Sequence, residues 1–354
     1  LRALRHEMAQ ALLAYNPLDL DERLYAGPTG TAHRLLKNCG LRDAPLTANE
    51  QLFVDKIVHE LVLAMDQQGM RIHNLVSTCL LYRDAYQVSL KPKHLRMPQQ
   101  LVWTLLSYIF SYPWAFRRQE DVEHYYSYVS DMLNWLHDML LDASNNAEEV
   151  ARLVSDIATP LASIFSFSPL YFSDHNLKDE CTWRAGIMEF VCQFTYGNTY
   201  RYRNLSVDHA FQTYNGREKS RIGILMPQFK SASETFATLP VFEHLDRERF
   251  EIILYTLKAN GGPLERYCAS RADRLTDITT RIDQQLRIIR GDDLDILFIG
   301  TNIMADRSAI GWLALHRLAR VQVTSICSPM TTGMRNMDGY IAGKLALPAD
   351  DPQP

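Results

Sequence analysis

The hydrophobic pattern of this sequence changes its period near residues 214–216, and that change constrains the fold more than any other feature. Before it, apolar residues recur at steps of three and four, which is typical of amphipathic helices. After it, short apolar runs alternate with amphipathic segments, as strands and crossover helices do in a parallel sheet. The 354 residues suffice for two domains. The sequence therefore predicts an irregular all-α domain over residues 1–215 and an α/β, Rossmann-like domain over residues 216–354.

The first half contains a helix start at residues 47–50. Thr47 and Glu50 form the pattern of a capping box, in which each side chain accepts a hydrogen bond from the backbone of the other residue. Apolar residues at helical spacing follow it, at Leu52, Phe53, Ile57, Leu61 and Met65. Further helices are predicted near residues 70–86, 98–112, 120–142, 147–165 and 178–196. No helical repeat of about 34 residues is present.

The second half alternates strands with helices. Strands are predicted at residues 221–226, 250–257, 295–300, 321–327 and 340–342. Helices are predicted at residues 234–245, 263–271, 280–290 and 307–318. In a doubly wound parallel sheet of this kind, ligands bind outside the carboxyl ends of the strands.

Composition excludes several classes of protein. The net charge of −4 gives no long-range attraction to nucleic acid or to an anionic membrane, and no apolar run reaches the roughly 18 residues of a membrane span. The six cysteines are widely spaced and form no C-x-x-C pair, which argues against a disulfide framework or a zinc site. We therefore expect a cytoplasmic protein. The chain starts without Met and ends at Pro354, so we expect it to be part of a longer protein.

Motifs for metal or nucleophile chemistry are weak. Asp293 and Asp295 resemble a metal-binding carboxylate pair, but they lie at the amino end of a predicted strand, so a solvated strand start is the favoured interpretation. The sequence has no histidine pair of zinc hydrolases, no G-x-S-x-G motif and no phosphate-binding P-loop. Gly300, alone after a strand, is weak support for a nucleotide site. We expect no metal and no cofactor, and the catalytic residues are not identified.

Two aromatic-rich segments have alternative interpretations. Residues 196–203 alternate aromatic and basic side chains, which suits either a nucleic-acid strand or a linker that packs on the adjoining domain. The low basic charge around them favours the linker. Aromatic residues are also dense between Trp103 and Phe116, where a hydrophobic core is favoured over a peptide groove.

Two polar loops follow predicted strands and are the candidate site. Residues 228–235 open a helix, whose first backbone N–H groups are able to hold an anion or a sugar, although a simple helix cap is equally consistent. Residues 325–333 follow a later strand of the same sheet, so both loops should face one cleft. The candidate residues are Gln228, Lys230, Ser231, Ser233, Glu234, Ser328, Thr331 and Thr332.

Three short segments carry a family resemblance. Residues 317–322, 328–333 and 337–341 resemble the first catalytic lobe of the O-GlcNAc transferase-like glycosyltransferases, which share an R-x-A-containing strand, a G-x-P-x-T loop and an acidic-aromatic strand end. Phe229, Ser231 and Ala232 look like the F-x-S-A turn of the bacterial HMW1C-like protein N-glucosyltransferases. Where that branch has histidines, this chain has Gln228, Lys230, Ser233 and Ser328, and Arg320 replaces the usual Pro.

The resemblance implies the first lobe of a two-lobed (GT-B type) enzyme. Such an enzyme would move glucose or N-acetylglucosamine from a UDP-sugar to a protein side chain without a metal ion, and its partners would be the UDP-sugar and an acceptor protein. The second lobe, which binds the nucleotide sugar in this family, is not represented in these residues. The alternative function is a non-catalytic module that binds an acceptor protein and assists a transferase.

Overall fold

The structure is a computed structural model, and its chain divides into two compact units. Unit 1 comprises Leu1–Phe165 and Pro169–Ser173, and unit 2 comprises Ser166–Ser168 and Asp174–Pro354. No helix in the described part of the chain is long and apolar enough to cross a membrane. The structure describes residues 1–16, 28–39, 41, 44–66, 71–88, 90, 99–113, 116, 118–163, 165–196, 217–305, 309–328 and 330–342.

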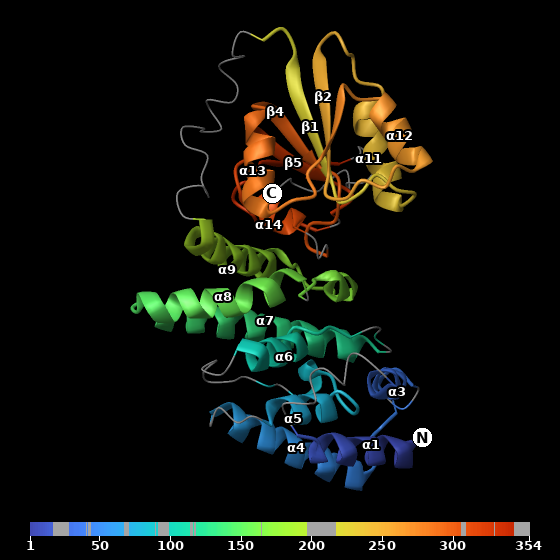
Figure 1. Cartoon of the computed structure of the whole chain (residues 1–354), viewed down its shortest axis with the longest axis vertical. Coiled ribbons are helices and arrows are strands. Elements are labelled where there is room, and N and C mark those ends of the chain that lie inside the picture. Colours follow the sequence, from blue (N-terminus) through green and yellow to red (C-terminus); the bar gives the residue numbers. More distant parts are fainter. Residues whose placement is uncertain are drawn as a thin grey trace. The chain divides into compact units, whose positions relative to one another are not determined.

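Unit 1 is helical (Figure 1). Its helices pack in succession: α1 and α4 against α5, α5 against α6, α6 against α8, and α8 against α7. The helix bounds are α1 Arg2–Ala14, α3 Pro28–Lys37, α4 Ala48–Asp66, α5 Ile72–Cys79, α6 Gln99–Ile109, α7 Gln119–Ala143 and α8 Ala147–Ser163. The structure also has two 3₁₀ turns. Turn η1, Ala85–Gln87, lies between α5 and α6, and turn η2, Ser168–Phe172, follows α8.

The predicted capping box is confirmed at the start of α4. The Thr47 backbone N–H donates to Glu50 Oε2 at 2.9 Å, and the Glu50 N–H donates to Thr47 Oγ1 at 3.3 Å. Glu50 also accepts hydrogen bonds from Arg2 and from Arg5, whose side chain is fully buried above the Tyr82 ring. One carboxylate therefore caps α4 and holds α1 against it.

The helix predicted over residues 70–86 is broken in two. Helix α5 ends at Cys79, and a separate 3₁₀ turn, η1, follows after residues 80–84. The break occurs because Asp84 and Gln87 form a capping box of their own, in which the Asp84 N–H donates to Gln87 Oε1 at 3.0 Å. Asp84 and Gln87 therefore start a separate helical turn at this point in the chain.

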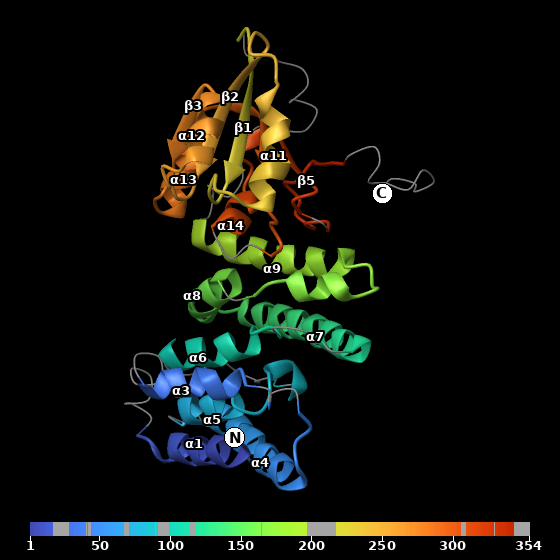
Figure 2. The same cartoon turned by 90° about the vertical axis from the view of Figure 1, so that its right-hand side faces the viewer.

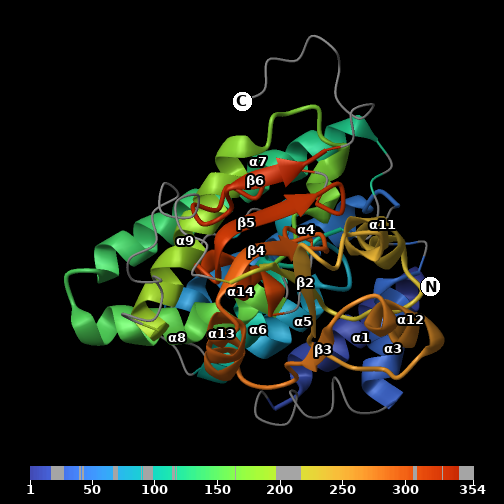
Figure 3. The same cartoon turned by 90° about the horizontal axis from the view of Figure 1, so that it is seen from above.

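Unit 2 contains a six-stranded sheet among its described residues, in the order β3-β2-β1-β4-β5-β6, with every strand pairing parallel. The predicted parallel sheet is therefore confirmed, starting one residue before the expected Arg221. Helices α11 and α12 cover one face, and α13 and α14 cover the other (Figure 3). The strands are β1 Ser220–Met226, β2 Phe250–Thr256, β3 Arg274–Asp277, β4 Leu294–Ile299, β5 Ala319–Ser325 and β6 Gly339–Ile341. The helices are α9 Lys178–Tyr196, α11 Ser233–Glu243, α12 Pro263–Ser270, α13 Ile282–Gly291 and α14 Ile310–Leu315.

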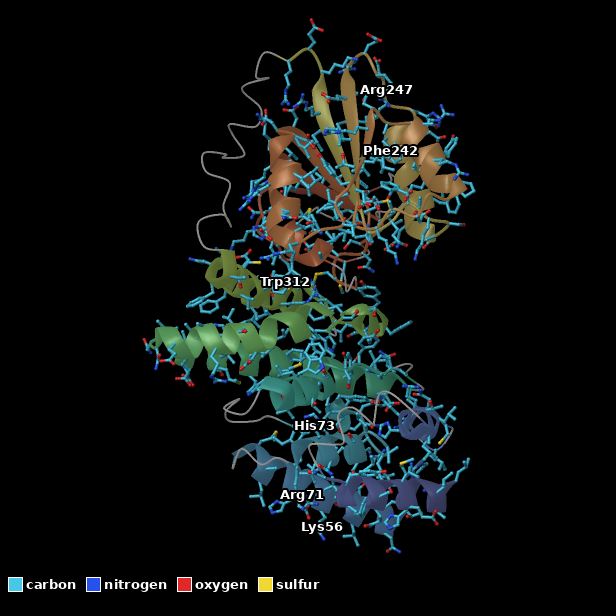
Figure 4. All side chains as sticks on the ribbon, in the orientation of Figure 1. Lys56, Arg71, His73, Phe242, Arg247 and Trp312 are labelled. Carbon is cyan, nitrogen blue, oxygen red and sulfur yellow. The ribbon has the colours of Figure 1, made fainter. Side chains whose placement is uncertain are left out.

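The sheet core lies under α11 and α12. Ile222, Ile224 and Met226 alternate along β1 and pack with Phe229 and Phe242, and Figure 4 labels Phe242. The central strand is buried almost throughout because it has a strand on each side and a helix on each face.

Helix α9 belongs to unit 2, although the sequence grouped residues 178–196 with the all-α domain. It packs beside α14 (Figure 2), and the buried Arg184 reaches Met304 Sδ at 3.3 Å and lies over the Phe167 ring. The expected boundary at residue 215 and most of the aromatic-basic segment 196–203 lie outside the described residues.

Candidate functional site

Three loops lie at the carboxyl edge of the sheet, after β1 (residues 227–232), β4 (residues 300–305) and β5 (residues 326–328 and 330–334). Strands β1 and β4 are neighbours, and the chain winds outward from them in opposite directions. This reversal of strand order is the topological switch point, where ligands of open parallel sheets bind. The predicted loop 228–235 lies at this point, and the predicted loop 325–333 follows β5, the strand beside β4.

Phe229 anchors the first loop. Its ring is fully buried and meets the Phe242 ring edge-on at 6.5 Å between centroids. Its carbonyl accepts a hydrogen bond from Asn260 Nδ2 at 3.3 Å. The neighbouring Gln228 and Lys230 are therefore presented from a fixed backbone.

Glu234 ties this loop to the one that follows β4. Its Oε1 accepts from Thr301 Oγ1 at 2.9 Å and from the Asn302 backbone N–H at 3.0 Å. Glu234 lies in the first turn of α11, where the helix dipole favours a negative charge. A carboxylate of the chain itself thus spans the switch point between β1 and β4.

Gly300 lets α11 approach the end of β4 closely. A Cβ atom at this position would lie 2.5 Å from Thr238 Oγ1 and 2.7 Å from Thr238 Cγ2. Thr238 Oγ1 donates to the Gly300 carbonyl at 3.2 Å. The glycine after this strand therefore serves helix–strand packing, which is one of the roles of glycine in this class of fold.

Cys327 joins the third loop to the same place. Its Sγ lies 3.6 Å from Thr238 Oγ1 and 3.8 Å from the Glu234 carbonyl oxygen, to which it donates. The first turns of α11, the β4 loop and the β5 loop are consequently one connected set of contacts. The predicted loops do meet at one edge of the sheet.

Four of the predicted residues offer free polar groups. The side chains of Gln228, Lys230, Ser231 and Ser233 make no hydrogen bond or ion pair with the residues that the structure describes. Lys230, Ser231 and Ser233 are exposed, and Gln228 is half-buried. No serine caps α11, because its N-cap is Ala232 and no side chain caps the helix. These hydroxyls therefore remain available to a ligand.

The other predicted residues have structural partners. Ser328 is fully buried and donates to the Met330 carbonyl at 3.4 Å, and Thr332 is buried and accepts from the Met334 N–H at 3.3 Å. Thr331 is exposed and accepts from the Gly333 N–H at 3.4 Å. The expectation that all eight residues line one cleft is not tested and stays a prediction, with Gln228–Ser233 as its accessible part.

The β5 loop is shaped by its contact with α9. Gly333 has a φ of +63°, and a Cβ atom there would lie 2.5 Å from the backbone of Cys181 and Thr182. Only glycine combines this left-handed conformation with such a close approach. The turn of Thr331 and Thr332 therefore docks the loop on α9 within unit 2.

The candidate residues chosen from the sequence do not include Thr238, Thr301, Asn302 or Cys327, although Cys327 lies within the predicted loop 325–333. Thr301 and Asn302 follow the strongly apolar β4 and Gly300, so their position after a strand was the available signal. Thr238 has no such signal, because a buried hydroxyl within a helix shows no distinctive pattern. For Cys327 the signal was its place in the predicted loop after β5.

The carboxylate pair at the amino edge of the sheet binds arginines. Asp295 accepts from Arg217 at 3.1 Å, from Arg320 at 3.1 Å and from the Arg221 backbone at 2.8 Å, while Asp293 pairs with Arg320 at 2.8 Å. No group of three metal-ligating side chains lies together within the described residues. The Asp pair therefore anchors the start of β4 to its neighbours.

Comparisons with known proteins give a distant structural similarity. No family model and no curated protein matches the chain. Among solved structures, it is similar to a mutant form of the O-GlcNAc transferase of Thermobaculum terrenum, with 17% sequence identity and a TM-score of 0.38. The similarity covers 95% of this chain and 54% of that protein, so this chain spans about half the length of the solved relative. At this identity and TM-score, the function of that enzyme does not carry over to this chain.

Proposed function

We propose that this chain is the first part of a two-lobed (GT-B type) protein glycosyltransferase of the O-GlcNAc transferase-like family, closest to its HMW1C-like branch. The full protein would transfer glucose or N-acetylglucosamine from a UDP-sugar to an acceptor protein, without a metal ion. The observation that carries the proposal is the run of free polar side chains at residues 228–233. These residues lie at the carboxyl edge of the sheet and include the F-x-S-A turn that resembles that family.

The chemistry of this edge favours neutral polar groups over a diphosphate. Gln228, Ser231 and Ser233 offer amide and hydroxyl groups, which suit a sugar or an acceptor side chain. Glu234 places a negative charge at the N-terminus of α11, where a phosphate would otherwise bind. In the proposal, the nucleotide is therefore held mainly by a second lobe outside these residues, and Lys230 is the cation that the first lobe contributes.

The cysteines support a reducing, cytoplasmic setting for this reaction. All six are free thiols, and five of them are buried. Burial raises the pKa of Cys79 and of Cys181 to about 12, so these thiols stay protonated and unreactive.

A transfer assay on the product of the complete gene tests the proposal. The expected result is transfer of labelled sugar from UDP-glucose or UDP-N-acetylglucosamine to an acceptor protein in the presence of a chelator. Lys230→Ala should lower kcat/KM by about tenfold or more, since it removes the positive charge that the candidate residues contribute. The matched control is Lys219→Ala, whose side chain lies before β1 at the opposite edge of the sheet.

The alternative function, a binding module without catalysis, predicts a different result. The complete protein would then bind the acceptor both with and without a UDP-sugar, and no labelled sugar would be transferred. Transfer that Lys230→Ala and Lys219→Ala affect equally would place the reaction elsewhere in the protein.

A further inference from the structure

A fourth loop of unit 2 reaches the candidate site from the strand next to β1. Strand β2 runs parallel to β1 and beside it (Figure 1), so its carboxyl end lies at the same edge of the sheet. In the register of the two strands, Thr256 stands opposite Met226, the last residue of β1. The β2 loop, residues 257–262, therefore begins level with the β1 loop.

Two side chains from β2 and its loop hold backbone carbonyls of the β1 loop. Thr256 Oγ1 donates to the Pro227 carbonyl at 3.3 Å, and Asn260 Nδ2 donates to the Phe229 carbonyl at 3.3 Å. Pro227 and Phe229 are the two neighbours of Gln228 in the chain. The backbone of Gln228 is therefore held on both sides by residues 29 and 31 positions away from the carbonyls that they bind.

Both donors are themselves fixed in place. The Thr256 side chain is fully buried, and its hydroxyl also accepts from the Lys258 N–H at 3.3 Å. Asn260 Oδ1 accepts from the Gly262 N–H at 2.8 Å, and the Asn260 backbone N–H donates to the buried Glu265 at 3.0 Å. The donor and the acceptor end of the Asn260 amide have different partners, which fixes the orientation of the amide.

Gln228 is thereby a firmly placed neutral group. Its side chain is half-buried and makes no hydrogen bond or ion pair with the residues that the structure describes. A primary amide offers two N–H donors and a carbonyl acceptor, so it matches a hydroxyl or amide group of a ligand. A backbone that is already held loses less conformational freedom when the ligand binds.

We propose that Thr256 and Asn260 are positioning residues for Gln228, and that Gln228 is the contact by which the site selects an uncharged hydroxyl or amide group of a substrate. The selected group belongs either to the sugar of the UDP-sugar or to the acceptor side chain. The role of Gln228 rests on the proposed glycosyltransferase function, whereas the hold on the β1 loop rests on the hydrogen bonds alone.

Cleavage of this chain by a lysine-specific protease under native conditions tests the hold without an activity assay. The exposed Lys230 directly follows the held Phe229, so the rate of cleavage after Lys230, measured by mass spectrometry, reports opening of the β1 loop. Thr256→Val and Asn260→Ala each remove one donor and should raise this rate about fivefold. Thr256→Ser keeps the hydroxyl and should be cleaved at the wild-type rate.

Thr324→Val is the matched control. Thr324 is also buried near the carboxyl end of its strand, but its hydroxyl donates at 3.1 Å to the carbonyl of Ile299, which lies in β4 and not in the β1 loop. This variant should leave cleavage after Lys230 at the wild-type rate. Unchanged cleavage in Thr256→Val and Asn260→Ala, or an equal acceleration by Thr324→Val, would overturn the hold.

Sugar transfer by the complete protein tests whether the hold acts through Gln228. Asn260→Ala and Gln228→Ala should each lower kcat/KM about tenfold, and Asn260→Ala should have little further effect in the Gln228→Ala background. A higher KM for the UDP-sugar assigns the selected group to the sugar, and a higher KM for the acceptor assigns it to the acceptor. Independent effects of the two substitutions would overturn the role of Gln228.

Failure of the inference is distinguishable from failure of the proposed function. If the complete wild-type protein transfers no sugar, the proposed function is wrong, and the protease rates still decide whether Thr256 and Asn260 hold the loop. If the wild type transfers sugar and Gln228→Ala transfers it equally well, the proposed function stands and the role of Gln228 is wrong.

Discussion

Single carboxylates hold distant segments of this protein together. Glu50 caps its own helix and receives Arg5 from α1, which lies 45 positions away in the sequence. Glu234 opens α11 and receives Thr301 and Asn302 from the end of β4. Each carboxylate stabilises the start of its own helix and also accepts hydrogen bonds from a distant segment. Substitution of either residue should therefore lower the stability of the protein more than its partial exposure suggests.

The contribution of Glu50 to the free energy of unfolding should depend on pH. Burial alone would raise the pKa of Glu50, but the hydrogen bonds from the Thr47 backbone and from Arg5 outweigh it and lower the pKa to about 2, from an ordinary value of 4.5. The stabilisation is therefore complete above about pH 4.5 and is lost as the pH falls toward 2. In urea unfolding, the difference in free energy of unfolding between the wild type and Glu50→Gln should become smaller as the pH falls through this range. The control Glu60→Gln, at an exposed ion pair of the same helix, should show no such trend.

Glu234→Ala should lower the free energy of unfolding of unit 2 by about 2 kcal/mol, because it leaves the buried Thr301 hydroxyl and the Asn302 N–H without their acceptor. Glu234→Gln keeps an acceptor and should lose about half as much. Denaturant titration with intrinsic fluorescence measures both. The exposed Glu248→Ala is the control and should stay within about 0.5 kcal/mol of the wild type. Equal effects of the Glu234 and Glu248 substitutions would rule out a bridging role.

Among the strands, the long buried ones were predictable from sequence, whereas of the two short exposed edge strands β6 was predicted and β3 was not. Strands β1, β2 and β4 are apolar runs buried on both faces, so their pattern alone located them within one or two residues. The edge strand β3, Arg274–Asp277, is missing from the prediction because its four residues are polar or half-exposed. Such a strand is defined by its partner β2, through pairs such as Leu254 with Leu275, and not by its own pattern.

The candidate site shows the same division. Its place was predictable, because the carboxyl ends of parallel strands share one edge. The sequence could not predict which hydroxyl groups stay accessible, because the burial of Ser328 and Thr332 depends on how their loop folds. The partners of Glu234 lie 67 and 68 positions away, a separation that no local pattern encodes.

The contact of α11 with β4 predicts a coupled pair of substitutions. Gly300→Ala places a methyl group against Thr238 and should cost about 1–3 kcal/mol of stability. Thr238→Ala removes both clashing atoms, so the double variant should be more stable than the sum of the single effects implies, by about 1 kcal/mol. A double-mutant cycle by thermal or urea unfolding measures the coupling. Simple additivity would show that the two residues do not contact each other in solution.

For the molecule as a whole, we predict that this chain binds UDP and UDP-sugars weakly and turns them over negligibly. Loss of one pre-organised donor typically costs roughly 3–4 kcal/mol of transition-state stabilisation. The positions where the related branch has histidines carry Gln228, Lys230, Ser233 and Ser328, and only Lys230 supplies a charge. Glu234 in the same loop opposes phosphate binding.

Calorimetry of this chain with UDP at moderate salt measures that prediction, and little or no heat is expected from the wild type. Glu234→Ala should bind UDP more tightly than the wild type, because it frees the Asn302 N–H and the first turn of α11 for phosphate. A micromolar dissociation constant for the wild type would mean that the first lobe carries a donor site of its own.

The bridge made by Glu234 also affects how this lobe can diverge among homologues. Glutamate codons change to those of glutamine, alanine, glycine or lysine by a single base substitution, and each of these removes the negative charge at the switch point. A lineage that gains a phosphate-binding role would therefore need only one such step at this position, provided that the rest of the sheet tolerates the lost hydrogen bonds. Glu234 is thus the residue at which a survey of homologous sequences should separate lobes that exclude phosphate from lobes that accept it.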